Sequence, residues 1–454
     1  MKLSERVKQA VQEQSQQKTL TRRPATRSEE APAGDPLGGY KQRIQETLYE
    51  KLGPDAFSSE RGEEGLRRAV TTELKRVIAA EGMPLSPEEI EKLVEDITEN
   101  ILGLGPLQRF LDDPDITEIM VNGLEAIFVE REGKLFETSA RFIDESHLLR
   151  VIDRIVSLVG RRIDEASPMV DARLSDGSRV NAVIPPLSVD GPTLTIRKFS
   201  RDPYQIEDLI RFGTVTEEIA DFLRVCVEGR LNLLISGGTG SGKTTLLNVL
   251  SGYIPNDQRI VTIEDAVELQ LHQRHVVRLE SRPPNIEGRG TVSIRDLVRN
   301  SLRMRPDRIV VGEVRGSEAL DMLQAMNTGH EGSLSTLHAN RPRDALSRLE
   351  TMVLMAGVEL PVKAIREYIS SAISLIVHLS RIKDGSRKIT QIAEITGMEG
   401  ETIALQDLFR FEYARGAGDG KVQGAIRATG LRPLFSEHLE DLGYELLPSL
   451  FESG

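Results

Sequence analysis

The chain has 454 residues, a length typical of about two or three domains, and its 39% hydrophobic and 28% charged residues are an ordinary balance for a soluble protein. Its formal net charge of −12 argues against non-specific binding of nucleic acid or anionic membranes by the bulk surface, although a local basic patch is compatible with it. The single cysteine, Cys226, excludes an intramolecular disulfide and a cysteine-rich zinc site.

No segment approaches the roughly 18 consecutive apolar residues of a membrane-spanning helix. The N-terminal segment MKLSERVKQAVQEQSQQK lacks the apolar stretch of a secretory signal. We therefore predict a cytoplasmic protein whose association with a membrane is peripheral and depends on partners.

A disordered tail is predicted over residues 1–39. This segment is rich in Gln, Ser, Thr, Arg and Pro, and it carries seven basic and five acidic side chains. Such a composition cannot bury enough apolar surface to offset the entropy lost on ordering. The tail is either a simple solvated extension, with a short helix at 3–16 as an option, or a docking segment.

A helical module is predicted over residues 40–103. The sequence Ser86-Pro87-Glu88-Glu89 has the features of a helix start, and this helix is expected to run to about Leu102. Upstream, apolar side chains recur at helical spacing in two stretches. These are Ile44, Leu48 and Leu52, and then Leu66, Val70, Leu74, Val77 and Ile78.

Residues 104–200 have a different pattern, which predicts a small α+β domain. A helix is expected over 146–160, and Asp176-Gly177 has the composition of a hairpin turn. Short runs with apolar–polar alternation predict strands. They cover 116–123, 126–132, 134–138, 169–174, 178–184 and 193–199.

A linker over 201–213 leads into a C-terminal domain over 214–454. Long apolar strands alternate there with helical stretches, which is the pattern of a mostly parallel sheet covered by helices on both faces. The fold class is therefore α/β. Strands are expected over 231–236, 259–264, 275–280, 307–313 and 333–338.

The strongest functional signal is the segment GGTGSGKTT, which fits the phosphate-loop pattern G-x-x-x-x-G-K-[ST]. The apolar run LNLLIS enters it as a strand and TTLLNVLSG leaves it as a helix, so a chance glycine-rich loop is disfavoured. Its backbone N–H groups and the helix N-terminus together form an anion site. Nucleotide binding is assigned to Gly237, Gly238, Thr239, Gly240, Ser241, Gly242, Lys243, Thr244 and Thr245.

Two side chains of this loop have specific roles. Lys243 is expected to reach the β- and γ-phosphates, and the hydroxyl of Thr244 is expected to bind Mg²⁺. No guanine-reading motif appears in the strands that follow, which favours ATP over GTP.

Two predicted strands end in acidic residues, Glu264 and Glu313, and ligands collect at such strand ends in open α/β sheets. ATP hydrolysis requires a carboxylate to orient the attacking water. We assign water activation to Glu264, and we assign Mg²⁺ binding through water, or water organisation, to Glu313; the two roles could be exchanged. Asp265 and Glu268 are weaker candidates, and any of these acids could instead cap a helix or pair with Arg315.

Two histidines, His330 and His338, flank one of the short predicted strands. We assign both as sensors of the γ-phosphate at the sheet edge. Packed structural histidines and a metal-binding pair are the alternatives, although their spacing does not match that of a zinc-binding helix.

Positive charge is the remaining requirement for phosphoryl transfer. Arg179 and Arg197, on predicted strands of the α+β domain, are the candidates for reaching the nucleotide, in the same subunit or in a neighbouring one. Arg303 and Arg305, before the strand that ends at Glu313, could act from the C-terminal domain. Each arginine could instead form a surface ion pair of little energetic weight.

Four motifs in the order GGTGSGKTT, TIEDAVEL, LRMRPDRIVVGEVRGSEA and GHEGSLSTLHAN resemble the type II/IV secretion-system ATPases, in which they are the Walker A, Asp box, Walker B and His box motifs. The lone acid after Gly312, unusual for P-loop proteins in general, is usual in that family. The resemblance covers about residues 105–440. The segments LGLGPLQRFLDDPDITEIMVNG, DARLSDGSRVNAVIPP and TLTIRKFS are similar to the branch that serves tight-adherence (Tad/Flp) pili, and the helical module and tail suit it.

The resemblance implies a homo-hexameric ring in which an N-terminal domain is stacked on a RecA-like motor domain. It also implies that ATP hydrolysis with Mg²⁺ drives assembly of a Tad/Flp-type type IV pilus from the cytoplasmic side of the inner membrane. The expected partners are integral membrane platform proteins, without direct contact to nucleic acid. Retraction of the same filament is left open.

Two other functions stay open. A conjugation-type ATPase of a type IV secretion system shares the four motifs, although such proteins usually lack the long N-terminal extension. A non-hydrolysing P-loop sensor is disfavoured because both Glu264 and Glu313 are present. A type II secretion ATPase typically carries a tetracysteine zinc subdomain, which one cysteine excludes.

Overall fold

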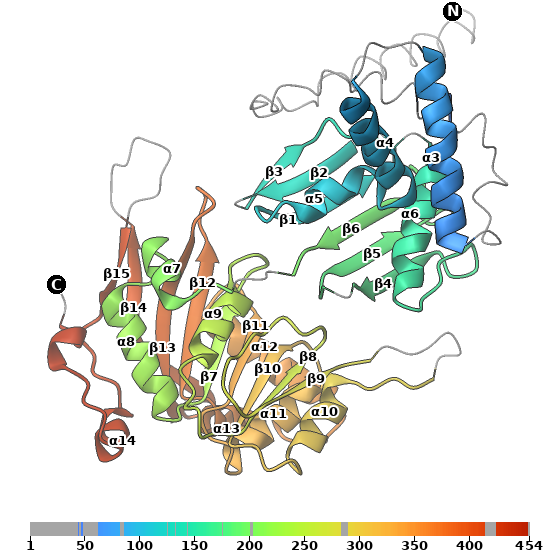
Figure 1. Cartoon of the computed structure of the whole chain (residues 1–454). Helices are drawn as coiled ribbons and strands as arrows, with labels where there is room; N and C mark the ends of the chain where they lie inside the picture. The colour runs from blue at the N-terminus through green and yellow to red at the C-terminus, as the bar shows by residue number, and fades with distance from the viewer. Residues whose placement is uncertain are drawn as a thin grey trace, which may run out of the picture. The chain divides into compact units, whose positions relative to one another are not determined.

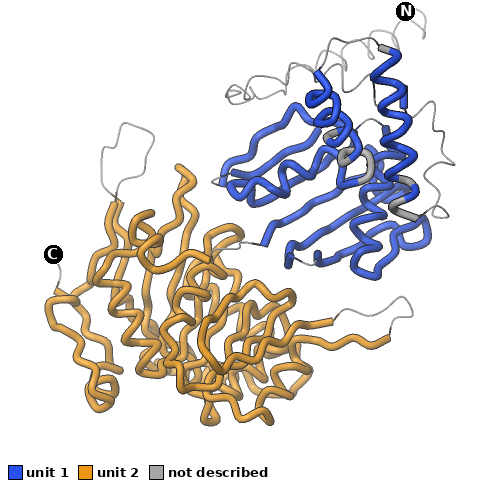
Figure 2. The backbone as a smooth tube through the Cα atoms, viewed as in Figure 1, with its two compact units in different colours: residues 1–199 blue, residues 200–454 orange. Residues whose placement is uncertain are grey.

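The computed structural model describes residues 44, 47–48, 62–81, 86–124, 126–131, 133–142, 144–174, 176–199, 203–282, 289–413 and 424–452. The predicted tail over 1–39 and the helical position Leu52 lie outside these residues. The chain divides into two compact units, residues 1–199 and 200–454, which Figure 2 draws in different colours.

Two helices, α3 (Gly62–Glu81) and α4 (Pro87–Leu102), pack against each other in unit 1. The start of α4 is fixed by a reciprocal cap: Ser86 Oγ accepts from the Glu89 N–H at 3.3 Å, and Glu89 Oε2 accepts from the Ser86 N–H at 2.7 Å. The residues with helical spacing form a small core of their own. It contains Ile44, Leu48, Val70, Leu74, Val77, Ile78, Leu93, Val94 and Ile97.

A six-stranded antiparallel sheet makes up the rest of unit 1, in the order β3-β2-β1-β6-β5-β4. One helix, α6 (Glu145–Leu158), buries its apolar side against the sheet core. The other elements are η3 (Gly105–Leu107), α5 (Gln108–Asp112), β1 (Ile116–Asn122), β2 (Ala126–Arg131), β3 (Lys134–Glu137), β4 (Met169–Arg173), β5 (Arg179–Val183) and β6 (Thr193–Arg197).

Unit 2 is built on a nine-stranded sheet in the order β15-β14-β13-β12-β7-β11-β10-β8-β9. The strands from β12 to β9 all run parallel. One strand, β11, lies between β7, which leads into the phosphate loop, and β10, which carries Glu313. This is the RecA-like arrangement, and it confirms the predicted α/β class. The parallel strands are β7 (Leu233–Gly237), β8 (Ile260–Glu264), β9 (Val276–Glu280), β10 (Arg308–Val314), β11 (Leu334–His338) and β12 (Leu375–Arg381).

Helices cover both faces of this sheet (Figure 1). On β7, Leu233 and Ile235 belong to the core beneath α8 and α9, whereas Leu234 belongs to the core beneath α10–α13, as alternation along a strand requires. Among the helices of the described ranges, none has the length and apolarity of a membrane span. The helices are α8 (Glu217–Glu228), α9 (Lys243–Ser251), α10 (Ile294–Ser301), α11 (Glu318–Asn327), α12 (Pro342–Met355) and α13 (Val362–Ala372).

Two features of unit 2 differ from the sequence-based expectation. The segment predicted as a linker contains a short helix, α7 (Ile206–Arg211), which starts with a capping box between Gln205 and Asp208. Strand β12 was not predicted, and neither were the antiparallel strands that continue the sheet after it. These strands and the elements after them are β13 (Arg387–Glu399), β14 (Thr402–Tyr413), β15 (Gly424–Ala428), α14 (Ser436–Asp441) and η4 (Pro448–Phe451).

Candidate nucleotide-binding and catalytic site

The phosphate loop connects the end of β7 to the start of α9 (Figure 1). Gly240 and Gly242 have φ values of +68° and +94°, a left-handed conformation that glycine adopts without steric cost. At Gly237 a Cβ atom would lie 2.5 Å from the carbonyl oxygen of Leu379 and 2.6 Å from Ser241 Oγ. The glycines therefore allow both the turns and the close approach of this loop to β12.

Lys243 is the first residue of α9 and is only 7% exposed. Its Nζ donates to the carbonyl of Gly238 at 3.0 Å and lies 3.4 Å from ring nitrogens of His338. Burial lowers the pKa of Lys243, because its ammonium group is withdrawn from water. A phosphate bound here would add negative charge that favours the charged form of Lys243.

A polar network extends from Lys243 along the carboxyl edge of the sheet. His338, the last residue of β11, places Nε2 2.8 Å from Glu313 Oε1. Arg315 donates to Glu313 Oε2 from Nη2 at 2.6 Å and from Nε at 2.9 Å. It also donates from Nη1 to Asp265 Oδ2 at 2.8 Å. The structure thus joins Lys243, His338 and Glu313, and it also forms the Glu313–Arg315 pair that the sequence left as an alternative.

The protonation of His338 follows from its surroundings. Burial, together with the positive charge of Lys243, lowers the pKa of His338 and favours the neutral imidazole. Nε2 lies 2.8 Å from Glu313 Oε1, and Lys243 Nζ lies 3.4 Å from both ring nitrogens, so these distances are compatible with the single ring proton on either nitrogen.

Strand β10 is irregular at Gly312 and Glu313, where its register with β11 shifts between Val311 and Val314. Such bulges change the direction of a side chain next to an active site. Glu264 is 3% exposed, and its Oε2 accepts from the backbone N–H groups of Glu268 at 2.8 Å and Leu269 at 3.0 Å. The structure therefore gives Glu264 an anchoring position and gives Glu313 the position nearest to Lys243 and His338.

Gly312 has a steric explanation. A Cβ atom at this position would lie 2.9 Å from Cγ of Glu264, whose carboxylate is held by two backbone hydrogen bonds. The side chain of Glu264 occupies the volume that an Asp at position 312 would need.

We expect Gly312→Ala to destabilise the protein by about 1–3 kcal/mol, the usual cost of overpacking, as measured by denaturant unfolding. In a Glu264→Ala background the clashing Cγ is absent, so the same substitution should cost much less. An equal loss of stability in both backgrounds would contradict this account of Gly312.

Three residues named from the sequence do not reach this edge. His330 precedes β11, and Arg303 and Arg305 precede β10, so all three lie near the opposite, amino edge of the sheet. The five residues of β11 alone span about 16 Å. Within the chain, His330 and His338 therefore do not form one cluster, because the strand between them separates them.

Arg179 and Arg197 lie in unit 1, where they are directly opposite each other on β5 and β6. Arg173 is opposite Arg179 on β4, so three arginines form a row across the sheet. Arg197 Nε also donates to Glu118 Oε1 at 2.7 Å.

Two side chains in contact with the phosphate-loop region were not candidates in the sequence analysis. His378 on β12 has its Nδ1 2.9 Å from the hydroxyl of Ser236, the residue before Gly237. Arg387 on β13 donates from Nε to the carbonyl of Gly240 at 3.0 Å. The Asp384-Gly385 turn could have indicated the hairpin that carries Arg387, but no sequence signal places that hairpin beside the phosphate loop.

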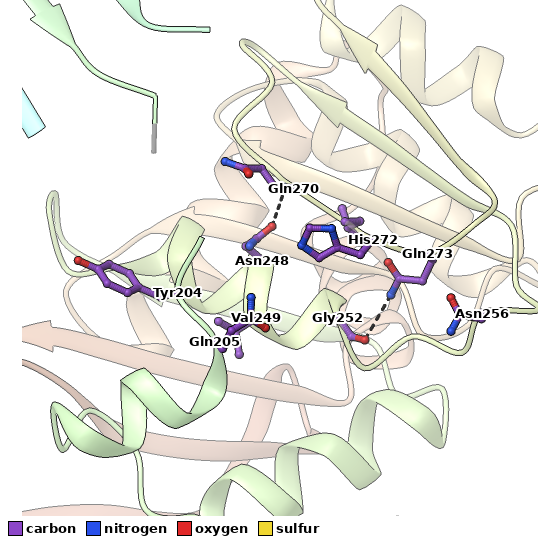
Figure 3. A pocket seen from close by; sticks show the side chains of 10 residues that line it. Tyr204, Gln205, Asn248, Val249, Gly252, Asn256, Gln270, His272 and Gln273 are labelled. Atoms are coloured by element: carbon purple, nitrogen blue, oxygen red, sulfur yellow. Dashed lines mark hydrogen bonds between the residues drawn. The ribbon is translucent and has the colours of Figure 1, made fainter. Parts of the chain in front are cut away.

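A pocket of about 220 Å³ lies farther along α9 and is lined by both polar and apolar residues (Figure 3). Asn248 Oδ1 accepts from the Gln270 N–H at 2.7 Å, and Gln273 Nε2 donates to the carbonyls of Ser251 at 2.9 Å and Gly252 at 3.3 Å. These bonds secure the C-terminal end of α9. The pocket is therefore separate from the phosphate loop at the N-terminal end of the helix.

Comparison with known proteins adds an independent result. The family described as "Type II/IV secretion system protein" matches residues 100–418. A Mycobacterium tuberculosis protein whose name assigns it provisionally to conjugal transfer is 37% identical over 311 residues, which cover 67% of this chain and 88% of that protein. The type IV secretion system protein VirB11 of Brucella suis is 33% identical over 318 residues, which cover 64% of this chain and 88% of that protein.

Among solved structures, the VirB11 ATPase from Brucella suis in complex with sulphate is similar to this chain. The match has 32% sequence identity and a TM-score of 0.36, and it covers 64% of this chain and 95% of that one. The family match covers residues 100–418, and the structure has the phosphate loop and the acid-bearing strand β10 within that range. The chain therefore belongs to the type II/IV secretion system protein family and is an ATPase.

Proposed function

We propose that this protein is a hexameric motor that hydrolyses ATP to power assembly of a Tad/Flp-type type IV pilus from the cytoplasmic side of the inner membrane. The observation that carries the motor chemistry is the continuous network from Lys243 through His338 and Glu313 to Arg315. It combines a phosphate-binding amine with a carboxylate positioned by two donors at one edge of the sheet.

The pilus branch is supported by the segments of unit 1 that resemble Tad/Flp motors. It is also supported by the α3–α4 pair, since the family match begins at residue 100 and α4 ends at Leu102. Almost all of this helical pair therefore precedes the part shared across the family.

The residues present fit a magnesium ion at the phosphate loop. The Thr244 hydroxyl in the first turn of α9 is an oxygen ligand of the kind that Mg²⁺ prefers, and the carboxylate of Glu313 would contact the ion only through a water molecule. Within the described ranges no group of three or more His, Cys, Asp or Glu side chains could hold a metal ion alone, so phosphate and water would complete the coordination. Bound there, Mg²⁺ would neutralise phosphate charge.

In the proposed reaction Lys243 holds the phosphates and Glu313 orients the attacking water and accepts its proton. The water oxygen bonds to the γ-phosphorus as the bond to the β–γ bridging oxygen breaks, which yields ADP and phosphate. His338 and Arg315 keep the carboxylate in place. We assign the base role to Glu313 because it lies beside His338 and within the electrostatic reach of Lys243, whereas Glu264 is buried and its Oε2 accepts from two backbone amides.

Arg179 and Arg197 are proposed to approach the phosphates when the two units close around the nucleotide. Like charges directly opposite each other across a sheet destabilise it, so the row that they form with Arg173 suits a polyanionic ligand. Loss of the γ-phosphate would release these arginines and allow the units to open.

We expect Arg197→Ala to lower the ATPase rate by about 10- to 100-fold, the weight of one charge-assisted hydrogen bond. The fold should stay intact, because the Arg197–Glu118 pair is exposed and contributes little stability. Arg131→Ala is the matched control, since it breaks the exposed Arg131–Asp113 pair of the same sheet. Normal turnover by Arg197→Ala would contradict the closure step.

A second candidate is an ATPase of a conjugation or type IV secretion machine, and the names of the relatives reported above favour it. In the native host, deletion of the gene should abolish surface pili, with rescue by the wild-type chain but not by Lys243→Ala. Normal pili with loss of DNA transfer or protein export would favour the second candidate.

The motor itself is tested with purified full-length chain. We expect a particle of about six times the 50.4 kDa chain mass in the presence of MgATP, and a higher ATPase rate with vesicles that contain the membrane platform proteins of the same machine. Neighbouring genes for a prepilin and its peptidase would support the pilus, whereas a relaxase gene would support conjugation.

A further inference from the structure

The hairpin between β12 and β13 places two arginines directly opposite each other. The strand register pairs Arg381 with Arg387, and the turn between them is fixed by Asp384, whose Oδ1 accepts from the N–H and Oγ–H of Ser386 at 2.9 and 2.7 Å. Gly385 has a φ of +88°, which suits its place in the turn. The two guanidinium groups therefore leave the hairpin on the same face.

This face of the hairpin lies along the phosphate loop. Arg387 Nε donates to the carbonyl of Gly240 at 3.0 Å. A Cβ atom at Gly242 would lie 3.5 Å from Cδ of Arg387, and one at Gly240 would lie 3.7 Å from Nη1 of Arg381. Both side chains thus reach the loop that is built to bind phosphate.

The hairpin is held in this position from its other side. Lys388, the residue after Arg387, donates from Nζ to the carbonyls of Gly213 at 2.6 Å and Phe212 at 3.4 Å, at the end of α7. Because successive residues of a strand point to opposite faces, Lys388 anchors the hairpin while Arg387 faces the loop. The arginine pair is therefore preorganised rather than carried by a free loop.

Two positive charges directly opposite each other are unfavourable in the absence of an anion. Within the described residues the side chain of Arg387 makes one hydrogen bond, which its Nε donates to the carbonyl of Gly240. The Nη groups of Arg387 are suited to a planar, bidentate contact with phosphate oxygens. A polyanion at the loop would offset the repulsion between Arg381 and Arg387 and accept hydrogen bonds from these Nη groups.

The position of the hairpin selects which phosphates it can reach. Strand β7 has β11 on one side and β12 on the other. His338 and Glu313, which act on the terminal phosphate, belong to the β11 and β10 side. The arginines approach the loop from the β12 side, away from that group.

We propose that Arg381 and Arg387 bind the α- and β-phosphates of the nucleotide from within the same subunit. This inference rests on the proposed function of the phosphate loop. Arg381 and Arg387 would then be a second set of cations, distinct from Arg179 and Arg197. They would bind ADP as well as ATP and slow the dissociation of ADP after hydrolysis.

The test is calorimetric titration of full-length protein with MgADP. We expect Arg381→Gln and Arg387→Gln each to raise the dissociation constant about 10-fold or more, within the 10- to 100-fold range of a charge-assisted hydrogen bond. Lys383→Gln is the matched control, because Lys383 is exposed at the turn of the same hairpin, and it should bind MgADP like the wild type.

Thermal unfolding with and without MgADP separates phosphate binding from a structural brace. Arg387→Gln also loses the hydrogen bond to Gly240, so its melting temperature without nucleotide is expected to fall; what phosphate binding requires is that the stabilisation by MgADP becomes smaller in both variants. Wild-type MgADP affinity in both variants would overturn the inference, as would a lower melting temperature of Arg387→Gln combined with normal binding by Arg381→Gln. Failure of the wild-type chain to bind MgADP would instead overturn the phosphate-loop site itself.

Discussion

Replacing Lys243 with alanine is expected to lower ATP turnover by at least about 100-fold, the cost of removing one preorganised donor from developing negative charge. The same change should weaken nucleotide binding by about 10-fold or more, because a charge-assisted hydrogen bond to the phosphates is lost. The reason is structural: Lys243 is the buried cation at the start of α9, between the carbonyl of Gly238 and the ring of His338.

Steady-state hydrolysis and titration with MgATP check this expectation, with Lys363→Ala, at an exposed position of α13, as the control. Loss of folding is not expected, since burial already disfavours the charged form of Lys243 in the nucleotide-free protein. The substitution should also raise the pKa of His338, because the charge of Lys243 lowers it, and this change is measurable by NMR titration. Near wild-type turnover would refute the site.

Replacing Glu313 with glutamine is expected to lower turnover by about 10²- to 10⁴-fold, the contribution of a general base, while MgATP still binds. Glutamine keeps the shape of the side chain but cannot accept the proton of the attacking water. Binding should change little, because we propose that Lys243 holds the phosphates and that Glu313 acts on the attacking water.

Glu350→Gln is the matched control for this variant. It weakens the Glu350–Arg366 pair, in which the arginine also donates from Nε and Nη2, although to both carboxylate oxygens, and which joins α12 to α13. Single-turnover hydrolysis should be normal in the control and nearly absent in Glu313→Gln. If Glu264→Gln abolishes hydrolysis while Glu313→Gln retains it, the base is Glu264, as the sequence analysis first assigned.

The local signals of the sequence predicted much of the architecture. The α/β class and the positions of β1 to β11 could be predicted from apolar–polar alternation and from runs of apolar residues. Each of these strands is short, so consecutive residues are enough to show which positions are buried. The long antiparallel strands β13 and β14 were not predicted. Their residues alternate irregularly, since both strands contain register shifts where they pair.

The histidines show where a sequence pattern is insufficient. His330 and His338 flank the same strand and are equivalent by pattern. Only the direction of that strand in the parallel sheet decides that His338 lies beside Gly237 at the carboxyl edge, whereas His330 does not. A similar reason applies to Arg303 and Arg305, which precede β10.

The sequence alone determined the phosphate loop, its lysine and the two acid-bearing strands, because that chemistry is encoded in contiguous residues whose backbone conformation is local. Tertiary structure decided which acid meets His338, why position 312 is glycine, and that Arg387 lies against Gly240 across 147 residues of chain. Such contacts depend on strand order and on the packing of side chains from distant segments, and neither is specified by the spacing of residues along the chain.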